Sequence, residues 1–341
     1  MTSLVELRDV TVRFGAESAL AARVRRRPRL AITALDGVSL SVARGESVGI
    51  VGESGCGKST LARVLVGLLE PTSGAVHVDG REVDRRRTQA MRRRIQMVFQ
   101  DPSSSLNPAR TVGQTLTELL RVHEIVPRAQ VGARAEELLD RVQLPCSVMA
   151  VHPRRLSGGQ RQRVGIARAL ALEPDVLVAD EAVAALDTSV QASILNLLAD
   201  LRRDLGLTVI CISHDLAVVR HVSERLVVMY LGRVVEAGPT SVVFADPRHP
   251  YTRALMAAVP RMGARKELGR AALRGEPPSL LELPSGCRFY PRCPIGQDVC
   301  RRADPGLSGS GEHRAACHFA WGPEAHPAGT ARAAASPSRT A

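Results

Sequence analysis

The stretch Gly52-Glu53-Ser54-Gly55-Cys56-Gly57-Lys58-Ser59 decides the fold of this chain. It follows the apolar residues 47–51, which have the composition of a buried strand, and it precedes the helical pattern of residues 60–69. Its glycines let backbone N–H groups surround phosphate oxygens, and its lysine supplies a positive charge for them. The stretch therefore predicts a phosphate-binding loop between a strand and a helix, with Ser59 as a ligand of Mg²⁺.

Two adjacent carboxylates follow another apolar segment. Residues 176–179 are all apolar, and Asp180 and Glu181 come directly after them. Sheets of this kind bind ligands at the carboxyl ends of their strands. We expect Asp180 to face the metal, directly or through water, and Glu181 to polarise or deprotonate the water that attacks a γ-phosphate. Taken alone, the pair is also compatible with an acidic turn at a strand end.

A third motif, Leu156-Ser157-Gly158-Gly159-Gln160, opens the helical pattern of residues 159–172. A serine followed by two glycines exposes the N–H groups of a helix N-terminus to an anion. By itself the motif is an ordinary helix cap. Its position between the phosphate loop and the carboxylate pair favours a second phosphate contact.

Six motifs stand in one order along the chain: GESGCGKS, Phe99-Gln100-Asp101, LSGGQ, VLVADE, Ala185-Leu186-Asp187 and Ile212-Ser213-His214-Asp215. In this order they resemble the ATP-binding subunits of ABC transporters, over residues 4–260. The resemblance implies an α/β fold, a P-loop NTPase domain with a RecA-like core and a helical subdomain. It also implies a head-to-tail dimer, in which each nucleotide lies between the phosphate loop of one subunit and the LSGGQ of the other.

The resemblance also implies roles for individual residues. Those expected to contact ATP are Phe14, Gly52, Glu53, Ser54, Gly55, Cys56, Gly57, Lys58, Ser59, Thr60, Ser157, Gly159, Gln160 and Asp187. The residues expected around Mg²⁺ are Ser59, Gln100 and Asp180, and the catalytic ones are Glu181, His214 and Gln100. His214 would contact the γ-phosphate, Gln100 would sense metal and water, and Phe14 would stack on adenine. An aromatic residue at a strand end is also typical of a core.

Periodicity predicts the remaining elements. Further strands are expected at residues 5–14, 38–42, 75–78, 95–99, 208–212 and 226–230, and further helices at 112–123, 133–142 and 190–205. Their alternation predicts a largely parallel sheet covered by helices. We expect an ATPase domain over residues 1–262 with a helical subdomain at about 101–172, a Cys-rich extension over 263–322, and a disordered tail over 323–341.

Two segments are similar to dipeptide and oligopeptide importers: residues 99–108 and Arg248-His249-Pro250-Tyr251-Thr252. The insertion between Phe14 and Ala34 resembles the second of the two paralogous ATPase subunits in such importers. The partners implied are two integral-membrane permease subunits, a paralogous ABC ATPase in a heterodimer and, indirectly, an extracytoplasmic peptide-binding protein. The implied function is ATP-driven import of di- or oligopeptides, or of a related solute such as nickel, at the cytoplasmic face of the membrane.

Four of the seven cysteines crowd into the Pro- and Gly-rich extension: Cys287, Cys293, Cys300 and Cys317. Their spacing lacks the close CxxC pairs of most structural zinc sites, and disulfides are uncommon in a reducing compartment. The resemblance to peptide importers implies a [4Fe-4S] cluster on these four thiolates. Zinc and free thiols remain open alternatives. His313 and His318 flank Cys317 and could substitute as ligands, but we expect them at the surface.

The formal charge of +12 raises the question of a nucleic-acid partner. The basic runs at residues 23–29 and 85–94 contain no aromatic side chains that could stack on bases, so we expect no such partner. An ABC ATPase of DNA repair is the main alternative, but those proteins usually insert a long coiled coil or zinc modules where this chain has about a hundred residues. We see neither a secretory signal nor an apolar stretch of the roughly 18 to 20 residues that cross a bilayer, and expect a cytoplasmic chain.

Overall fold

The structure is a computed structural model, and it describes residues 3–15, 31–83, 87–101, 106–184, 186–258, 275–276, 278–281 and 283–322. Most of the predicted basic insertion, the boundary predicted at residue 263 and the predicted tail lie outside these residues, as do Ala185 and residues 102–105. Among the helices that are described, none is long and apolar enough to cross a membrane.

The main sheet has the strand order β11-β12-β10-β9-β3-β8-β7-β6. Its parallel part consists of β3 (Ser47–Val51), β6 (Ile95–Val98), β7 (Val176–Asp180), β8 (Thr208–Ser213) and β9 (Arg225–Tyr230). Every residue of β3, β7 and β8 is buried, which explains why these strands have continuous apolar sequences. The antiparallel edge consists of β10 (Arg233–Pro239), β12 (His313–Ala315) and β11 (Ser308–Ser310). The predicted parallel sheet is confirmed for the five strands β9, β3, β8, β7 and β6.

A second sheet is antiparallel, with the order β2-β1-β4-β5. Its strands are β1 (Ser3–Phe14), β2 (Ile32–Ala43), β4 (Ser73–Val78) and β5 (Arg81–Glu82). The sequence predicts the first three as strands but assigns them no sheet of their own. The alternating burial along β2 is the pattern of a sheet with one solvent-exposed face. Helix α2 (Lys58–Val66) contributes Leu61 and Leu65 to a core that both sheets share.

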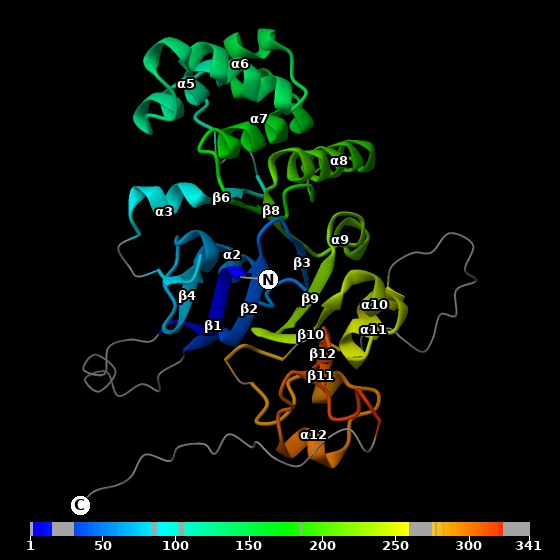
Figure 1. The fold of residues 1–341 in the computed structure, drawn as a ribbon. Helices are drawn as coiled ribbons and strands as arrows, with labels where there is room; N and C mark the ends of the chain where they lie inside the picture. Colours follow the sequence, from blue (N-terminus) through cyan, green and yellow to red (C-terminus); the bar gives the residue numbers. More distant parts are fainter. Residues whose placement is uncertain are drawn as a thin grey trace, which may run out of the picture.

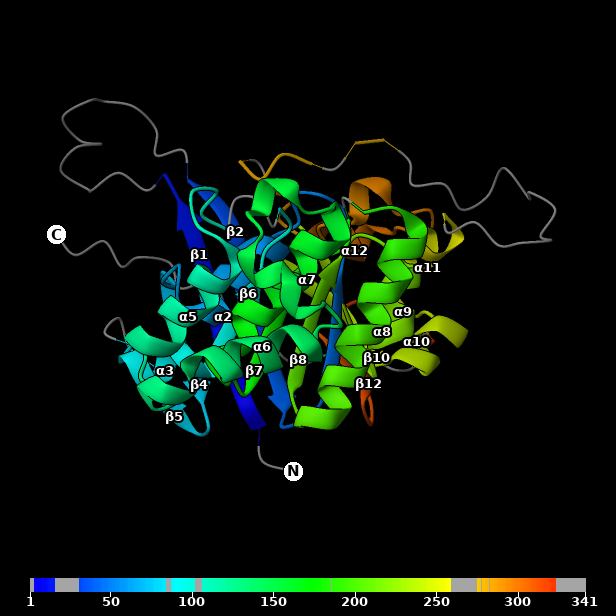
Figure 2. The same ribbon diagram turned by 90° about the horizontal axis from the view of Figure 1, so that it is seen from above.

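Helices form a layer beside the β6 end of the main sheet, at the top of Figure 1. The longer ones are α5 (Val112–Val122), α6 (Val131–Arg141), α7 (Gly158–Leu170) and α8 (Thr188–Leu205). Seen from above, in Figure 2, they lie side by side across the molecule. They agree with the predicted helices to within two residues at each end. Short elements complete the chain: α3 (Gln89–Arg94), η1 (Arg128–Gln130), η2 (Cys146–Ala150), η3 (Pro153–Arg155), α9 (Leu216–Val222), α10 (Thr240–Ala245), α11 (Pro250–Ala257), η4 (Tyr290–Arg292) and α12 (Asp298–Arg302).

The Cys-rich extension, at the bottom of Figure 1, packs onto the ATPase part rather than standing apart from it. Its strand β12 pairs with β10 of the main sheet. Its Phe289 is buried against Tyr230 and Tyr251, with ring centroids 5.4 and 5.5 Å away. The extension therefore completes a core that it could not build alone. The division of the chain into domains stays a prediction.

Candidate nucleotide site

The order of the parallel strands brings the predicted motifs to one edge of the sheet. Strand β3 leads into the phosphate loop, its neighbour β8 leads to His214, and the next strand, β7, ends at Asp180. Because parallel strands all end at the same edge, motifs far apart in the chain meet there. The sequence prediction that residues 52–59, Asp180, Glu181 and His214 share one site is consistent with this arrangement.

The phosphate loop needs glycine at two positions for steric reasons. A Cβ atom on Gly52 would lie 2.3 Å from the carbonyl oxygen of Met229, and one on Gly57 would lie 2.4 Å from that of Ala34. Gly57 also has φ of 107°, a conformation that other residues rarely adopt, and it precedes the first residue of α2. The loop is thus a tight turn enclosed by the neighbouring strands.

Lys58 places its charge inside the curl of this loop. The side chain is buried, and Nζ donates to the carbonyl oxygens of Gly52, at 2.6 Å, and Glu53, at 3.0 Å. The free backbone N–H groups at the N-terminus of α2 point out along the helix axis, and a helix N-terminus favours bound anions. Loop and lysine together form a cationic cradle of the kind that holds phosphate groups.

Next to the loop lies a pair of oxygen ligands. Ser59 Oγ donates to Asp180 Oδ1 at 3.3 Å. Burial raises the pKa of Asp180, and the charge of Glu181 acts in the same direction, while the hydrogen bond from Ser59 opposes it. A hydroxyl and a carboxylate are the hard oxygen donors that Mg²⁺ prefers, so these residues fit the predicted metal.

Glu181, the residue after Asp180, contacts His214. The imidazole Nδ1 lies 3.3 Å from Glu181 Oε1, and the Glu181 N–H donates to the carbonyl of Ile212 at 2.8 Å. Glu181 has φ of 47°, the left-handed region, which is uncommon for a residue with a side chain. Such conformations are frequent at functional sites. The His214 side chain is 57% exposed, so it can reach a substrate at this edge.

Comparison with known proteins agrees with this geometry. Residues 35–184 match the family model described as ABC transporter, and residues 235–300 match that of the oligopeptide/dipeptide transporter C-terminal region. A putative peptide import ATP-binding protein of Brucella abortus (strain 2308) is 51% identical over 295 residues, which is 85% of this chain and 88% of the relative. A probable peptide ABC transporter ATP-binding protein of Sinorhizobium fredii is 51% identical over 291 residues, covering 84% and 82%. The chain belongs to the ABC transporter family of ATP-binding proteins.

Solved ABC structures have the same fold. The cbiO1 subunit of Clostridium perfringens, part of the ABC transporter complex cbiONQ, aligns with a TM-score of 0.62 and 29% identity over 72% of this chain and 92% of that one. The ATP-binding cassette MJ0796, in a dimeric post-hydrolysis state with ADP and Pi, aligns with a TM-score of 0.60 and 32% identity over 69% and 98%. This chain is accordingly an ABC ATPase, and the matches do not support the DNA-repair alternative.

The structure also places the other predicted site residues of the ABC ATPase. Ser157 and Gln160 form a reciprocal cap at the start of α7, where Gln160 N–H donates to Ser157 Oγ at 3.2 Å and Ser157 N–H to Gln160 Oε1 at 3.0 Å. Gly159 packs there against Val190 of α8. Phe14, Gln100 and Asp187 are exposed. Within the described ranges, no hydrogen bond or ion pair joins any of these residues to residues 52–59.

Two residues that contact the phosphate loop are missing from the sequence prediction. Tyr251 accepts the Glu53 N–H at 2.8 Å, and Arg292 binds the Glu53 carboxylate through both terminal nitrogens. Tyr251 belongs to the importer-like segment, so that segment could have been suspected of a structural role. Arg292 is 239 positions from Glu53, and no sequence pattern links them.

The four cysteines of the extension come together in the ABC ATPase. Cys287 N–H donates to the carbonyl of Cys300 at 2.8 Å. Burial and, to a lesser extent, the neighbouring thiols of Cys287, Cys317 and Cys300 together raise the pKa of Cys293 to about 11. In the described part of the chain, no three ligating side chains are close enough for a single metal ion. The predicted [4Fe-4S] cluster on these four thiols therefore stays a prediction.

The expectation that His313 is a surface residue is wrong. It is buried, and its Nε2 lies 2.8 Å from Oε1 of the fully buried Glu236. The carboxylate needs this partner because burial without one is unfavourable. His318 is half-buried, with Nε2 3.0 Å from the carbonyl of Ala303. Both imidazoles are thus engaged in contacts other than the thiols.

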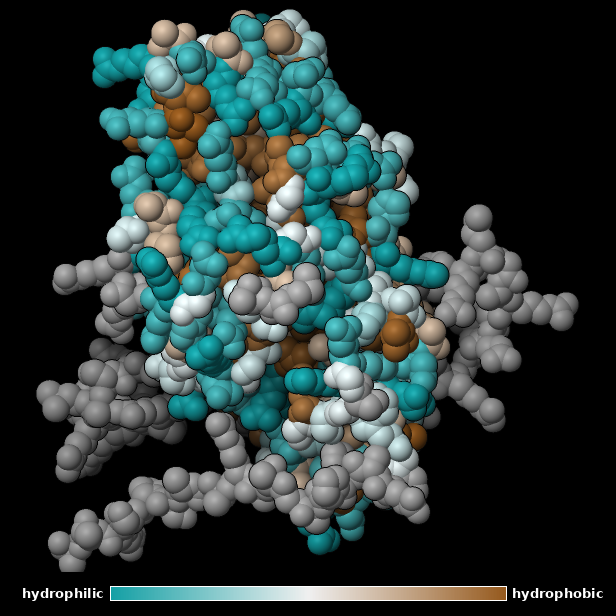
Figure 3. All heavy atoms as spheres, in the orientation of Figure 1, coloured by the Kyte–Doolittle hydropathy of each residue, from teal (hydrophilic) through white to brown (hydrophobic). Residues whose placement is uncertain are grey.

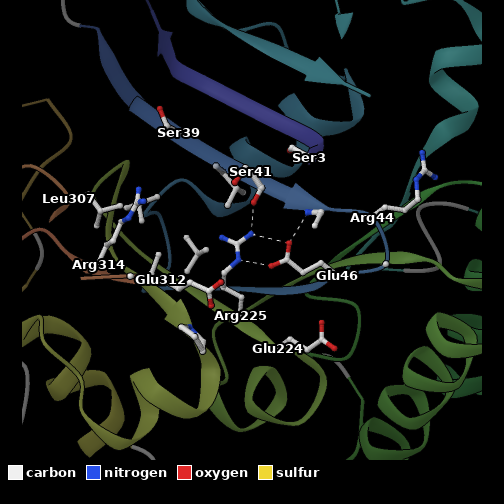
Figure 4. Close-up of a pocket in the computed structure, with 18 of the residues that line it drawn as sticks. Ser3, Ser39, Ser41, Arg44, Glu46, Glu224, Arg225, Leu307, Glu312 and Arg314 are labelled. Carbon is white, nitrogen blue, oxygen red and sulfur yellow. Dashed lines mark hydrogen bonds and ion pairs between the residues drawn. The ribbon is translucent and has the colours of Figure 1, made fainter. Parts of the chain in front are cut away.

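A hollow of about 750 Å³ lies elsewhere, bordered by β2, β9, β10 and the extension. Figure 4 shows Arg225 and Glu46, two of its charged side chains, turned toward each other. Arg225 Nε lies 2.6 Å from Glu46 Oε1, and Arg202 pairs with Glu224 at 2.5 Å. Because these charges neutralise each other, the hollow is not built to hold a phosphate. The nucleotide site of the ABC ATPase remains at the opposite ends of the strands.

Proposed function

We propose that this ABC ATPase powers the import of di- or oligopeptides, or of a related solute such as nickel, as a peripheral subunit at the cytoplasmic face of the membrane. The observation that carries the proposal is the match of residues 235–300 to the C-terminal region of oligopeptide/dipeptide transporters. That region begins in β10 and includes the Tyr251 and Arg292 contacts to the phosphate loop. The names of the relatives, which are peptide import proteins, support the same substrate class.

The proposed reaction is the attack of water on the γ-phosphorus of ATP, with breakage of the bond to the ADP oxygen. Lys58 and the loop N–H groups hold the phosphates, and Ser59, Asp180 and Gln100 hold Mg²⁺, which when bound neutralises phosphate charge. Glu181 takes the proton from the attacking water. His214 contacts the γ-phosphate and is held by Glu181. The 3.3 Å contact between Glu181 and His214 supports this assignment.

The complete site is proposed to be shared between two subunits. Ser157, Gly159 and Gln160 would contact the nucleotide held by a paralogous ATPase, Asp187 would cross the interface, and Phe14 would stack on adenine. Support comes from the absence, among the described residues, of any hydrogen bond or ion pair between the α7 cap and the phosphate loop of its own chain, and from the exposure of Phe14 and Asp187. In a head-to-tail pair the exposed groups of each subunit face the loop of the other.

The permease subunits are proposed to dock on α5. A hollow of about 580 Å³ runs along this helix, and it is lined by Ala109, Arg110, Gln114, Thr117, Glu118, Arg121 and Val122. Val122 is 65% exposed, and Figure 3 shows apolar side chains gathered over α5 at the top of the molecule. Exposed apolar surface next to a hollow is typical of a protein interface. The extracytoplasmic peptide-binding protein would act through the permeases.

The cysteines Cys287, Cys293, Cys300 and Cys317 are proposed to hold a [4Fe-4S] cluster. Support comes from the 2.8 Å backbone hydrogen bond between Cys287 and Cys300, and from the burial of Cys300 and Cys317 in a segment with little core of its own. Anaerobic purification, followed by iron and sulfide analysis and absorption spectra, tests this proposal. A brown protein with both elements is expected, whereas a colourless protein that holds zinc or no metal contradicts it.

The composition of the complex tests the proposed function. We expect the chain, purified from native membranes in mild detergent, to bring two permease subunits and a second ATPase with it. A Val122→Arg chain should bring less permease, because a charge would enter the docking surface. Recovery of nucleic acid in place of the permeases would contradict the proposal.

A further inference from the structure

Glu53, the second residue of the phosphate loop, is bound by two side chains from the C-terminal part of the chain. Arg292 Nη1 lies 2.8 Å from Glu53 Oε2, and Nη2 lies 3.0 Å from Oε1, so the guanidinium grips both carboxylate oxygens. Tyr251 Oη accepts the Glu53 N–H at 2.8 Å. Main chain and side chain of one loop residue are thus both fixed from outside the ATP-binding motifs.

This contact is largely removed from water. Arg292 is 6% exposed and Tyr251 is fully buried, and the guanidinium also lies 3.4 Å from Tyr230 Oη. The hydrogen bonds to Glu53 raise the pKa of Arg292, so the arginine stays charged. A paired charge in such surroundings interacts far more strongly than a surface pair. The contact is therefore strong enough to influence the loop.

A second arginine of the extension supports the other end of the loop. Arg288 donates to the carbonyl of Leu231 and to the carboxylate of Asp36. The residue after Leu231, Gly232, donates its N–H to the carbonyl of Cys56 at 2.8 Å. The extension thus contacts the loop directly at Glu53, and indirectly at Cys56 through the turn at Leu231 and Gly232.

We propose that Arg292 is a positioning residue for nucleotide binding, and that the Cys-rich extension is a working part of the phosphate site. Arg292 neutralises a carboxylate that would otherwise stand, unpaired, beside the phosphates of ATP. It also holds the loop in the conformation in which its backbone surrounds the Lys58 side chain. This inference rests on the proposal that residues 52–59 bind ATP, and it adds that their affinity depends on a side chain 239 positions away.

If Arg292 acts by neutralising the charge of Glu53, its loss should have effects on nucleotide binding that loss of a merely structural contact would not have. Without Arg292, the free Glu53 carboxylate repels the nucleotide, and the repulsion is greater for ATP than for ADP because ATP carries more charge. Salt should weaken the difference between the variant and the wild type. Removal of the Glu53 charge as well should restore binding, since no unpaired charge is then left.

The test is equilibrium binding of fluorescent ATP and ADP analogues with Mg²⁺ to the full-length chain. We expect Arg292→Gln to weaken ATP binding about tenfold, and ADP binding less, as loss of one charge pair in a partly dry site implies. Arg292→Lys should restore part of the affinity, and the Glu53→Gln, Arg292→Gln double variant most of it. The control is Arg302→Gln, because Arg302 lies in the same extension, 79% exposed, and pairs only loosely with Asp298 at 3.6 Å.

Equal affinity of the Arg292→Gln chain and the wild type would overturn the inference, as would a double variant that binds as weakly as Arg292→Gln alone. If Arg292→Gln does not fold, Glu53→Gln is compared with the double variant, and a tenfold difference between these two contradicts the charge role. A wild-type chain that binds no ATP would instead refute the proposed function.

Discussion

At the scale of single residues, the site depends on close approaches that only small side chains permit. Gly52 faces the carbonyl of Met229, and the loop it begins was predicted in full from the sequence because its eight residues are contiguous. Asp180 ends β7, Glu181 follows it and His214 follows β8, so their places at strand ends could be predicted from the apolar sequences before them, while their roles stay predictions. The orientation of Glu53 toward Arg292 could not be predicted, because it depends on the packing of the extension.

Substitution of Gly52 by alanine should disrupt the loop. A Cβ atom 2.3 Å from a backbone oxygen forces the strands apart, so we expect a loss of about 2 kcal/mol in the free energy of unfolding, together with weaker ATP binding. Gly132→Ala is the matched control, because Gly132 lies in α6 with nothing within 4 Å of the added atom. That variant should be up to about 1 kcal/mol more stable. Urea unfolding measures both, and equal effects would contradict the account.

Asp180→Asn should stabilise the fold and abolish hydrolysis. Burial raises the pKa of Asp180 in the folded state, so its ionised form destabilises the fold, and the wild type regains that stability as pH falls through this pKa. The asparagine variant has no charge to bury and no carboxylate for Mg²⁺. We expect a midpoint of thermal unfolding a few degrees higher at neutral pH. A lower midpoint, or preserved Mg²⁺-dependent hydrolysis, would refute the assignment.

At the scale of elements, the sequence predicts the long helices and the buried strands well and the short elements poorly. Helix α8 has clear periodicity and strand β7 a continuous apolar run, whereas β11 and β12 have three residues each and form only where β12 pairs with β10 and β11 with β12. The antiparallel sheet was missed as a unit because pairing of β1 with β4 is not visible in either strand alone.

The folded structure of the extension should depend on its four cysteines. Cys293 directly follows Arg292. Loss of the proposed iron–sulfur cluster should therefore also make the position of the Arg292 side chain less fixed. We expect Cys293→Ser to lower the iron content at least severalfold and to make the extension more sensitive to protease. Cys146→Ser is the control, because Cys146 is exposed in η2, in the helical layer. Unchanged iron and protease resistance in Cys293→Ser would rule out the proposed ligand.

At the scale of the whole molecule, our proposal gives the chain two half-sites rather than one complete site. The phosphate loop leads into α2, and its Ser59 contacts Asp180 at the end of β7, whereas the Ser157 cap begins α7 in the helical layer at the top of Figure 1. We therefore expect the isolated chain to hydrolyse ATP slowly, with a rate per subunit that rises at least tenfold when the second ATPase is added. A rate per subunit that stays constant on dilution and on addition of the partner would contradict a shared site.

The most direct test of the account is ATP-driven peptide uptake by proteoliposomes that contain the purified complex and its binding protein. Glu181→Gln should bind ATP but lower both hydrolysis and uptake by at least about a hundredfold, because the proton acceptor for the attacking water is lost. The control is Glu136→Gln, since Glu136 is exposed on α6, away from the phosphate loop. Peptide uptake at the wild-type rate with the Glu181→Gln chain would contradict the central claim.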